Sequence, residues 1–338
     1  MKKSVTDLGK LAHHLKKKGK IKEAEETYGK LLDLDKNNTY ALVGLGDLKR
    51  RAKRFEDAVG FYKQCLLIEK DNWHALVGLG DAYRGLRNLD EALIIWFQCL
   101  KLYPHDPKTM TRVADCLKKK GNFESSKSYY FMALKNNPCD PYALMGLGQI
   151  AVKEKENETA LDFFERVIEI SPDSVIALTA AANIHRKNRS FQKAISLYDR
   201  VLKIDPRNSH AWHGKADSLR GRKKYRSAIG AWNRALENGM DRKIGLSRIG
   251  DSYICLNDLN MAEANYKKAM KIGYDKYACL GISKVHELRG HSDKALEILS
   301  MLVHKEPKDP RICKASRKFR NKHPDMMQLL FMSDGPVV

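Results

Sequence analysis

A repeated stretch that contains two glycines is the first candidate for a functional motif, because Gly-x-Gly can bind phosphate. The letters ALVGLGD occur at 41–47 and again at 75–81. A Gly-x-Gly binds phosphate when it follows a buried strand and opens a helix. Here the motif lies in the middle of an expected helix, because apolar residues recur around it at helical spacing. We therefore interpret Gly46 and Gly80 as small residues that allow close helix packing, and we predict no nucleotide site.

Two histidine patterns come close to metal sites. His286, Glu287 and His291 approach the metalloprotease H-E-x-x-H, but the second histidine comes one residue late and leaves the metal-binding face of the helix. His210 and His213 lie three residues apart on an expected helix, where both could bind a metal, yet no third ligand is evident. We predict no metal, no cofactor and no catalytic residues.

Charged residues form a more regular pattern. Aspartate recurs at one helical position, at Asp47, Asp81, Asp115, Asp217 and Asp251. A base recurs three residues after that position, at Lys16, Arg50, Arg84, Lys118, Arg186 and Arg220. Residues three apart share a helix face, where such pairs contribute about 0.2–0.5 kcal/mol each. The rows therefore predict either solvated pairs or contacts that fix neighbouring elements, or else a surface that holds a partner segment by its charges.

The elements that must position these residues repeat every 34 residues. A small residue recurs in nine units, at Ala24, Ala58, Ala92, Ser126, Ala160, Ala194, Ala228, Ala262 and Ala295. Four residues later an aromatic follows in eight of them, at Tyr28, Tyr62, Trp96, Tyr130, Phe164, Tyr198, Trp232 and Tyr266. Each unit carries two runs of apolar residues at helical spacing, with turn-forming residues between them. Proline ends the second helix of several units because it lacks an N–H, at Pro104, Pro138, Pro172, Pro206 and Pro307.

This pattern resembles the tetratricopeptide repeat. The third unit shows it most completely, with Leu76, Leu79-Gly80, Tyr83, Ala92, Trp96 and Pro104. The resemblance implies an all-α fold, a right-handed α-α superhelix of about nine 34-residue helix-turn-helix repeats. We expect the array to cover 5–309, a basic capping helix 310–323 and an apolar tail 324–338, with units starting near 5, 39, 73, 107, 141, 175, 209, 243 and 276.

The resemblance also implies that first helices line a concave groove and that the protein is a non-catalytic interaction scaffold. We expect the groove to bind a protein or peptide segment through Asp47, Arg50, Asp81, Arg84, Asp115, Lys118, Asp217, Arg220 and Asp251, with Tyr40, His74, Tyr142, His210 and His213 nearby. Chaperone-binding members hold a terminal carboxylate with Lys and Asn. This chain has Gly9, His13, Val43 and Gly44 in its first two units, so that mode looks absent.

The net charge of +21 predicts a partner of acidic character. No single basic stripe stands out in the sequence. Nucleic acid is the alternative partner, but most aromatics occupy packing positions and the aspartate row would repel phosphate. Seven cysteines without a C-x-x-C pair argue against a disulfide framework and indicate a reducing compartment. With no apolar run long enough for a signal or a span, we expect a cytoplasmic protein.

The tail differs from the repeats. It carries Met326, Met327, Leu330 and Phe331, which are apolar on nearly all sides. Exposed segments of this kind often bind something, and methionine adapts to varied partners. We expect the tail either to fold onto the last repeat or to dock into a second copy, which would produce self-association.

Overall fold

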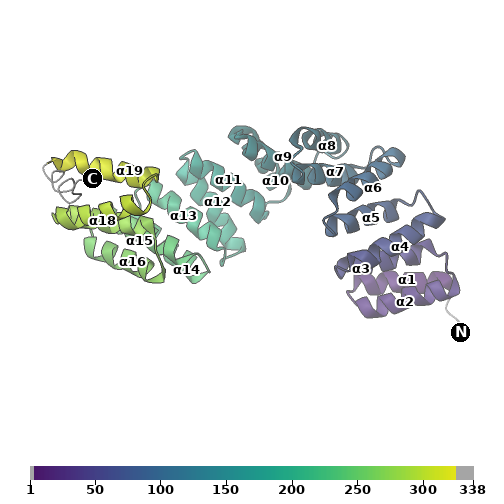
Figure 1. Ribbon diagram of the computed structural model, residues 1–338. Coiled ribbons are helices and arrows are strands. Elements are labelled where there is room, and N and C mark those ends of the chain that lie inside the picture. Colours follow the sequence, from purple (N-terminus) through teal and green to yellow (C-terminus); the bar gives the residue numbers. More distant parts are fainter. Residues whose placement is uncertain (1–3, 325–338) are drawn as a thin grey trace, which may run out of the picture. The chain divides into compact units, whose positions relative to one another are not determined.

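The computed structural model describes residues 4–324, and these residues form helices and turns without a strand. Figure 1 shows the helices in chain order. The first helix of each pair has an odd number, and the bounds are α1 Val5–Lys17, α3 Thr39–Arg51, α5 Trp73–Gly85, α7 Pro107–Lys119, α9 Pro141–Glu154, α11 Val175–Lys187, α13 Ser209–Gly221, α15 Arg242–Cys255 and α17 Lys276–Leu288. The second helices are α2 Ile21–Leu34, α4 Phe55–Ile68, α6 Leu89–Leu102, α8 Phe123–Asn136, α10 Asn157–Ile170, α12 Phe191–Ile204, α14 Tyr225–Glu237, α16 Leu259–Ile272 and α18 Ser292–Lys305. A final helix, α19, spans Pro310–Lys322.

The helices group into two compact units, Met1–Pro172 and Asp173–Val338. The first holds α1 to α10 and the second α11 to α19. Within each unit, first helices also contact the first helix of the next pair, as α1 does α3 and α15 does α17. First helices therefore lie side by side and run in the same direction. Their shared face is called the odd-helix face below.

Polar caps begin the first helices. The residue before every odd-numbered helix is Asn, Asp or Ser, and its side chain accepts a backbone N–H from the first turn, as Asn38 does from Ala41 at 3.0 Å. Such a cap contributes about 1 kcal/mol because it satisfies a donor that the helix leaves unpaired. The helix starts therefore follow the spacing of these caps, which is 34 residues except for the 33 between Asn208 and Asp241.

The turn inside each pair needs a left-handed residue. All nine such turns have one residue with φ between 59° and 83°, at Gly19, Lys53, Arg87, Gly121, Lys155, Arg189, Lys223, Asn257 and Gly290. Glycine adopts this conformation freely, whereas other residues lose roughly 1–2 kcal/mol there. Five of the nine turns therefore hold a strained lysine or arginine.

The repeated glycines pack against aromatic rings. A Cβ on Gly44 would lie 2.4 Å from the Tyr28 ring of the preceding pair, and one on Gly46 would lie 2.7 Å from the Tyr62 ring of its own pair. Both rings are fully buried. The packing role predicted for Gly46 is thus seen, and Gly44 has the same role.

Candidate partner-binding site

The predicted rows of acids and bases form a ladder of ion pairs between successive first helices. The base of one helix reaches the aspartate 31 residues ahead, on the next first helix. In the first unit Lys16 Nζ lies 2.7 Å from Asp47 Oδ2, and Arg50 Nη1 lies 3.4 Å from Asp81 Oδ2. In the second unit Arg186 lies 3.1 Å from Asp217, and Arg220 lies 3.8 Å from Asp251.

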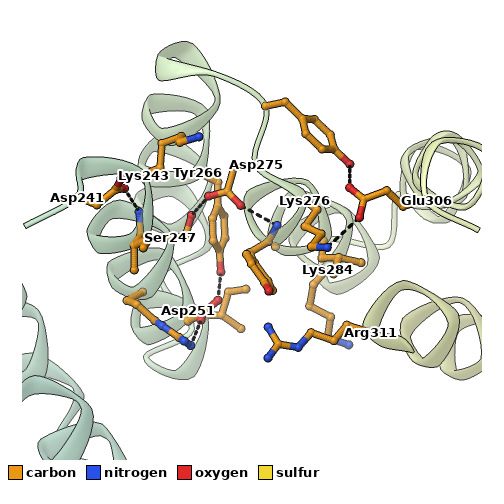
Figure 2. Close-up of a pocket in the computed structure, with 17 residues that line it drawn as sticks. Asp241, Lys243, Ser247, Asp251, Tyr266, Asp275, Lys276, Lys284, Glu306 and Arg311 are labelled. Carbon is orange, nitrogen blue, oxygen red and sulfur yellow. Dashed lines mark hydrogen bonds and ion pairs between the residues drawn. The ribbon is translucent and has the colours of Figure 1, made fainter. Parts of the chain in front are cut away.

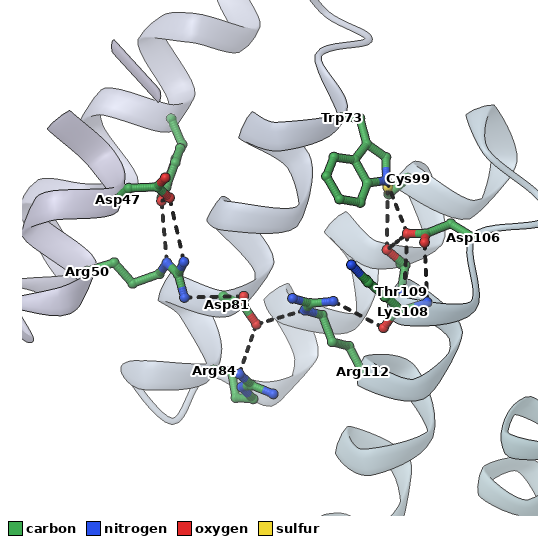
Figure 3. Close-up of polar contacts among 11 residues, drawn as sticks. Asp47, Arg50, Trp73, Asp81, Arg84, Cys99, Asp106, Lys108, Thr109 and Arg112 are labelled. Atoms are coloured by element: carbon green, nitrogen blue, oxygen red, sulfur yellow. Dashed lines mark hydrogen bonds and ion pairs between the residues drawn. The ribbon is translucent and has the colours of Figure 1, made fainter. Parts of the chain in front are cut away.

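Asp81 is the most heavily engaged member of the ladder. Its side chain is 5% exposed and faces three guanidinium groups, which Figure 3 shows converging from three successive first helices. Arg84 Nη2 lies 2.9 Å from Oδ1, Arg112 Nε lies 3.2 Å from Oδ1, and Arg50 bridges Asp81 to Asp47. These contacts match the alternative in which the pairs fix neighbouring repeats. Binding of a partner by the same side chains stays a prediction.

Buried tyrosines complete the ladder where they occur. The hydroxyl of Tyr62 donates to Asp47 at 2.7 Å, and that of Tyr266 donates to Asp251 at 2.8 Å. Burial alone would raise the pKa of Asp47, but hydrogen bonds from Lys16 and Tyr62 hold it below its usual value. Burial dominates at Asp251 and raises its pKa, because the nearest cations, Arg248 and Arg220, lie 3.8 Å away. Lys118 of α7 donates to Asp115 on the same helix at 3.2 Å, and to Gln149 on α9, the next first helix, at 2.9 Å.

The predicted aromatic and histidine residues differ in exposure. Tyr40 is 49% exposed and Tyr142 75% exposed, and His210 is also exposed. His213 instead packs against Asp217, with Nε2 3.6 Å from Oδ2. Burial lowers the pKa of His213, although the negative charge of Asp217 acts in the opposite direction. Tyr40 borders a cavity of about 460 Å³ in the first unit, which His13, His74 and Asp47 also line.

A larger cavity lies on the odd-helix face of the second unit. Its volume is about 820 Å³, and residues of α15, α17 and α19 line it (Figure 2). Three exposed apolar side chains contribute to its wall, namely Ile244, Tyr274 and Tyr277. A volume of this size suits a small ligand or a few side chains of a peptide.

The cavity wall carries cations without a carboxylate partner. Lys276 is neutralised by Glu306 at 2.8 Å and Asp309 at 2.6 Å. Lys243 makes no ion pair with the described residues. Arg311 makes none either, and its guanidinium carbon lies 4.9 Å from the centre of the Tyr277 ring. The cavity therefore offers apolar surface beside two cations without an ion pair to the described residues, with the carboxylates of Asp241 and Asp275 also in its wall.

Sequence reasoning missed this cavity, although the register contained its signal. Tyr40, Tyr142 and His210 are each the second residue of a first helix. Continuing the same position along the chain leads to Lys243 and Tyr277, and Arg311 takes it in α19.

The tail residues Met326, Met327, Leu330 and Phe331 lie outside the described residues. Among residues 4–324, no helix has the length and apolar character that crossing a bilayer requires.

Comparisons with known proteins agree on the repeat. One family model for the tetratricopeptide repeat matches residues 10–66 and 114–175, and another matches 151–217. A search of curated proteins found no match.

Solved structures share the all-α repeat fold. The C-terminal part of a TPR repeat-containing protein from Cytophaga hutchinsonii is 14% identical with a TM-score of 0.59, over 70% of this chain and 97% of that one. PilF of Pseudomonas aeruginosa is 14% identical with a TM-score of 0.51, over 59% and 91%. The APC/C hetero-tetramer Cut9-Hcn1 gives 13% and 0.52, over 78% and 52%. The predicted all-α repeat fold is confirmed, and residues 10–66 and 114–217 of the chain match the tetratricopeptide repeat.

Proposed function

We propose that this protein is a non-catalytic scaffold whose odd-helix face binds a segment of a partner protein. Repeat arrays of this kind offer extended surfaces for protein recognition. The observation that carries the proposal is the 820 Å³ cavity of the second unit, where the apolar groups Ile244 and Tyr277 lie beside Lys243 and Arg311. Within the second unit His210 would add a further contact, and Tyr40 and Tyr142 would contribute to the odd-helix face of the first unit.

The chemistry of the cavity favours a segment that combines an apolar side chain with a carboxylate. The apolar side chain would cover Ile244 and Tyr277, removing their exposed area from water. The carboxylate would neutralise Lys243 or Arg311, and Arg311 presents a planar guanidinium suited to bidentate carboxylate binding. Figure 2 shows Lys243 across the cavity from Arg311, so the two cations could hold acidic groups at different points of one segment.

Selection from a displayed random peptide library on the full chain tests the proposal. We expect enriched peptides to pair a large apolar residue with Asp or Glu. The double variant Lys243→Glu, Arg311→Glu should weaken their binding by tenfold or more, about 1.4 kcal/mol. The matched control Lys268→Glu, Lys271→Glu changes the net charge equally on exposed positions of α16 and should bind normally.

Two results would contradict the proposal. One is that no peptide is enriched by the folded chain. The other is that enriched peptides bind the cavity variant and the α16 variant equally well, since the cavity would then not be the site.

A further inference from the structure

The two edges of the first unit differ in charge. Because first helices run side by side in one direction, all turns inside the pairs lie at one edge of the unit and all turns between pairs at the other. The edge of turns inside the pairs, here called the basic edge, exposes Lys17, Lys18, Arg51, Lys53, Arg87 and Lys119. At the opposite edge, Asp35, Asp106 and Asp140 accept backbone N–H bonds. The net positive charge is therefore more segregated than the sequence suggested.

Two residues of the basic edge also have the left-handed backbone conformation described above. Lys53 and Arg87 have φ of 61° and 62°, in the left-handed region that glycine fills at Gly19 and Gly121 in the equivalent turns. A side chain at such a position strains the backbone. Because glycine would avoid this strain, as it does in the equivalent turns, a lysine or arginine there suggests a function for the charged side chain.

These cations lack partners within the described residues. Arg51, Lys53, Arg87 and Lys119 make no side-chain ion pair or hydrogen bond there. The bases of the ladder differ, because Lys16 and Arg50 are held by aspartates. The basic edge therefore retains its charge for an external anion, whereas the ladder does not.

We propose that the basic edge of the first unit binds an extended acidic protein segment, a run of Asp and Glu residues. Neighbouring helices pack about 8–10 Å apart, so three successive turns, separated by two such spacings, span roughly 16–20 Å. An extended chain covers about 3.3 Å per residue, so about six residues would contact three turns. This surface is separate from the cavity of the second unit.

Nucleic acid fits this edge less well. Single strands are held by stacking of bases on exposed rings, but Phe55 and Phe123, the rings beside these turns, are half-buried, and Phe55 packs against Gly85. Carboxylates also interrupt the edge, since Asp57 pairs with Arg54 and Asp90 with Lys120. A flexible acidic segment can follow the cations between them.

Fluorescence anisotropy of the full chain with a labelled decapeptide of alternating Glu and Asp tests the proposal. We expect binding that weakens as ionic strength rises, because exposed charges are screened. The edge variant Arg51→Glu, Lys53→Glu, Arg87→Glu should bind about tenfold more weakly or worse. The control Lys36→Glu, Lys70→Glu, Lys101→Glu carries the same charge change on exposed residues at or next to turns between pairs and should lose less than threefold.

Three outcomes would overturn the proposal. Equal losses in the edge and control variants would mean that net charge alone attracts the peptide. Loss on Lys243→Glu, Arg311→Glu would assign the acidic peptide to the cavity instead. Tighter binding of a uridine 20-mer or a DNA duplex than of the peptide, with the same loss in the edge variant, would identify a nucleic-acid surface.

A second variant separates charge from fold. In Lys53→Gly, Arg87→Gly the strained turns receive the residue that they favour. We expect the thermal midpoint to rise while affinity for the decapeptide falls at least threefold. A raised midpoint with unchanged affinity would show that these cations do not contact the acidic segment.

Discussion

Replacing Asp81 with asparagine should loosen the first unit around the third repeat. Asparagine keeps the shape of the side chain but removes the charge that three guanidinium groups share. Removing one partner of a buried ion pair costs about 3–5 kcal/mol. The arginine side chains are 27–33% exposed, so water replaces part of the lost interaction. We therefore expect a loss of about 2–3 kcal/mol.

Native-state amide hydrogen exchange is the suitable assay, because repeat arrays open locally and global unfolding is not always two-state. Each 1.4 kcal/mol changes an opening equilibrium about tenfold. Protection of amides in α3, α5 and α7 should therefore fall by about 30-fold to 150-fold. The control is Asp115→Asn. Asp115 is 35% exposed and pairs with one lysine. It also accepts from the Tyr130 hydroxyl at 2.5 Å, a bond that the asparagine carbonyl can keep, so its loss should stay below about 1 kcal/mol.

The reasoning fails if the two variants lose protection equally, or if Asp81→Asn changes exchange less than threefold. Either result would mean that the three arginines are satisfied by water and that the ladder contributes little. Asp81 would then be free to take part in partner binding, as the sequence pattern also allowed.

Two further predictions concern packing and pH. Gly46→Ala should destabilise the chain by about 1–3 kcal/mol, because its Cβ would lie 2.7 Å from the buried Tyr62 ring. The control Gly60→Ala has open space around it and should stabilise the chain by about 0.5–1 kcal/mol. Thermal melts of the two variants compare these effects, and equal shifts would refute the packing role of Gly46. Hydrogen bonds from Lys267 and then Arg289 lower the pKa of Glu263 from 4.5 to about 2, so its stabilisation is present above pH 4.5 and is lost as the pH falls towards 2. The difference in melting temperature between wild type and Glu263→Gln should therefore shrink from pH 6 to pH 2.5, and a constant difference would contradict the low pKa.

The fold could be predicted because its signals are local and periodic. Each signal lies within a single helix pair. These signals are the small and aromatic residues every 34 positions, the polar caps before first helices and the prolines after second helices. The ladder could be predicted only in part. The i,i+3 pairs such as Asp47 with Arg50 follow from one helix, but the link from Arg50 to Asp81 depends on how two first helices lie side by side.

The surfaces proposed for binding were harder to predict, because they depend on which charges remain unpaired. Arg50 and Arg84 looked like the available cations, yet both face buried Asp81. Lys243 and Arg311 looked unremarkable, yet they make no ion pair with the described residues. Exposure and pairing are properties of the packed array, so net charge and spacing alone did not separate the two groups.

The choice between tyrosine and tryptophan at the buried aromatic position explains why the ladder is uneven. Three of the tyrosines donate their hydroxyl to the aspartate 15 residues before, namely Tyr62 to Asp47, Tyr130 to Asp115 and Tyr266 to Asp251. Trp96 takes that position opposite Asp81. Its buried Nε1 has no hydrogen-bond partner among residues 4–324, and its ring lies 5.6 Å from the Arg84 guanidinium. Asp81 thus lacks a hydroxyl donor and has arginines as its donors instead. The ion pairs on the odd-helix face of the first unit therefore depend on whether the buried aromatic ring offers a hydroxyl donor. The cations outside the ladder are the ones that remain available to a partner.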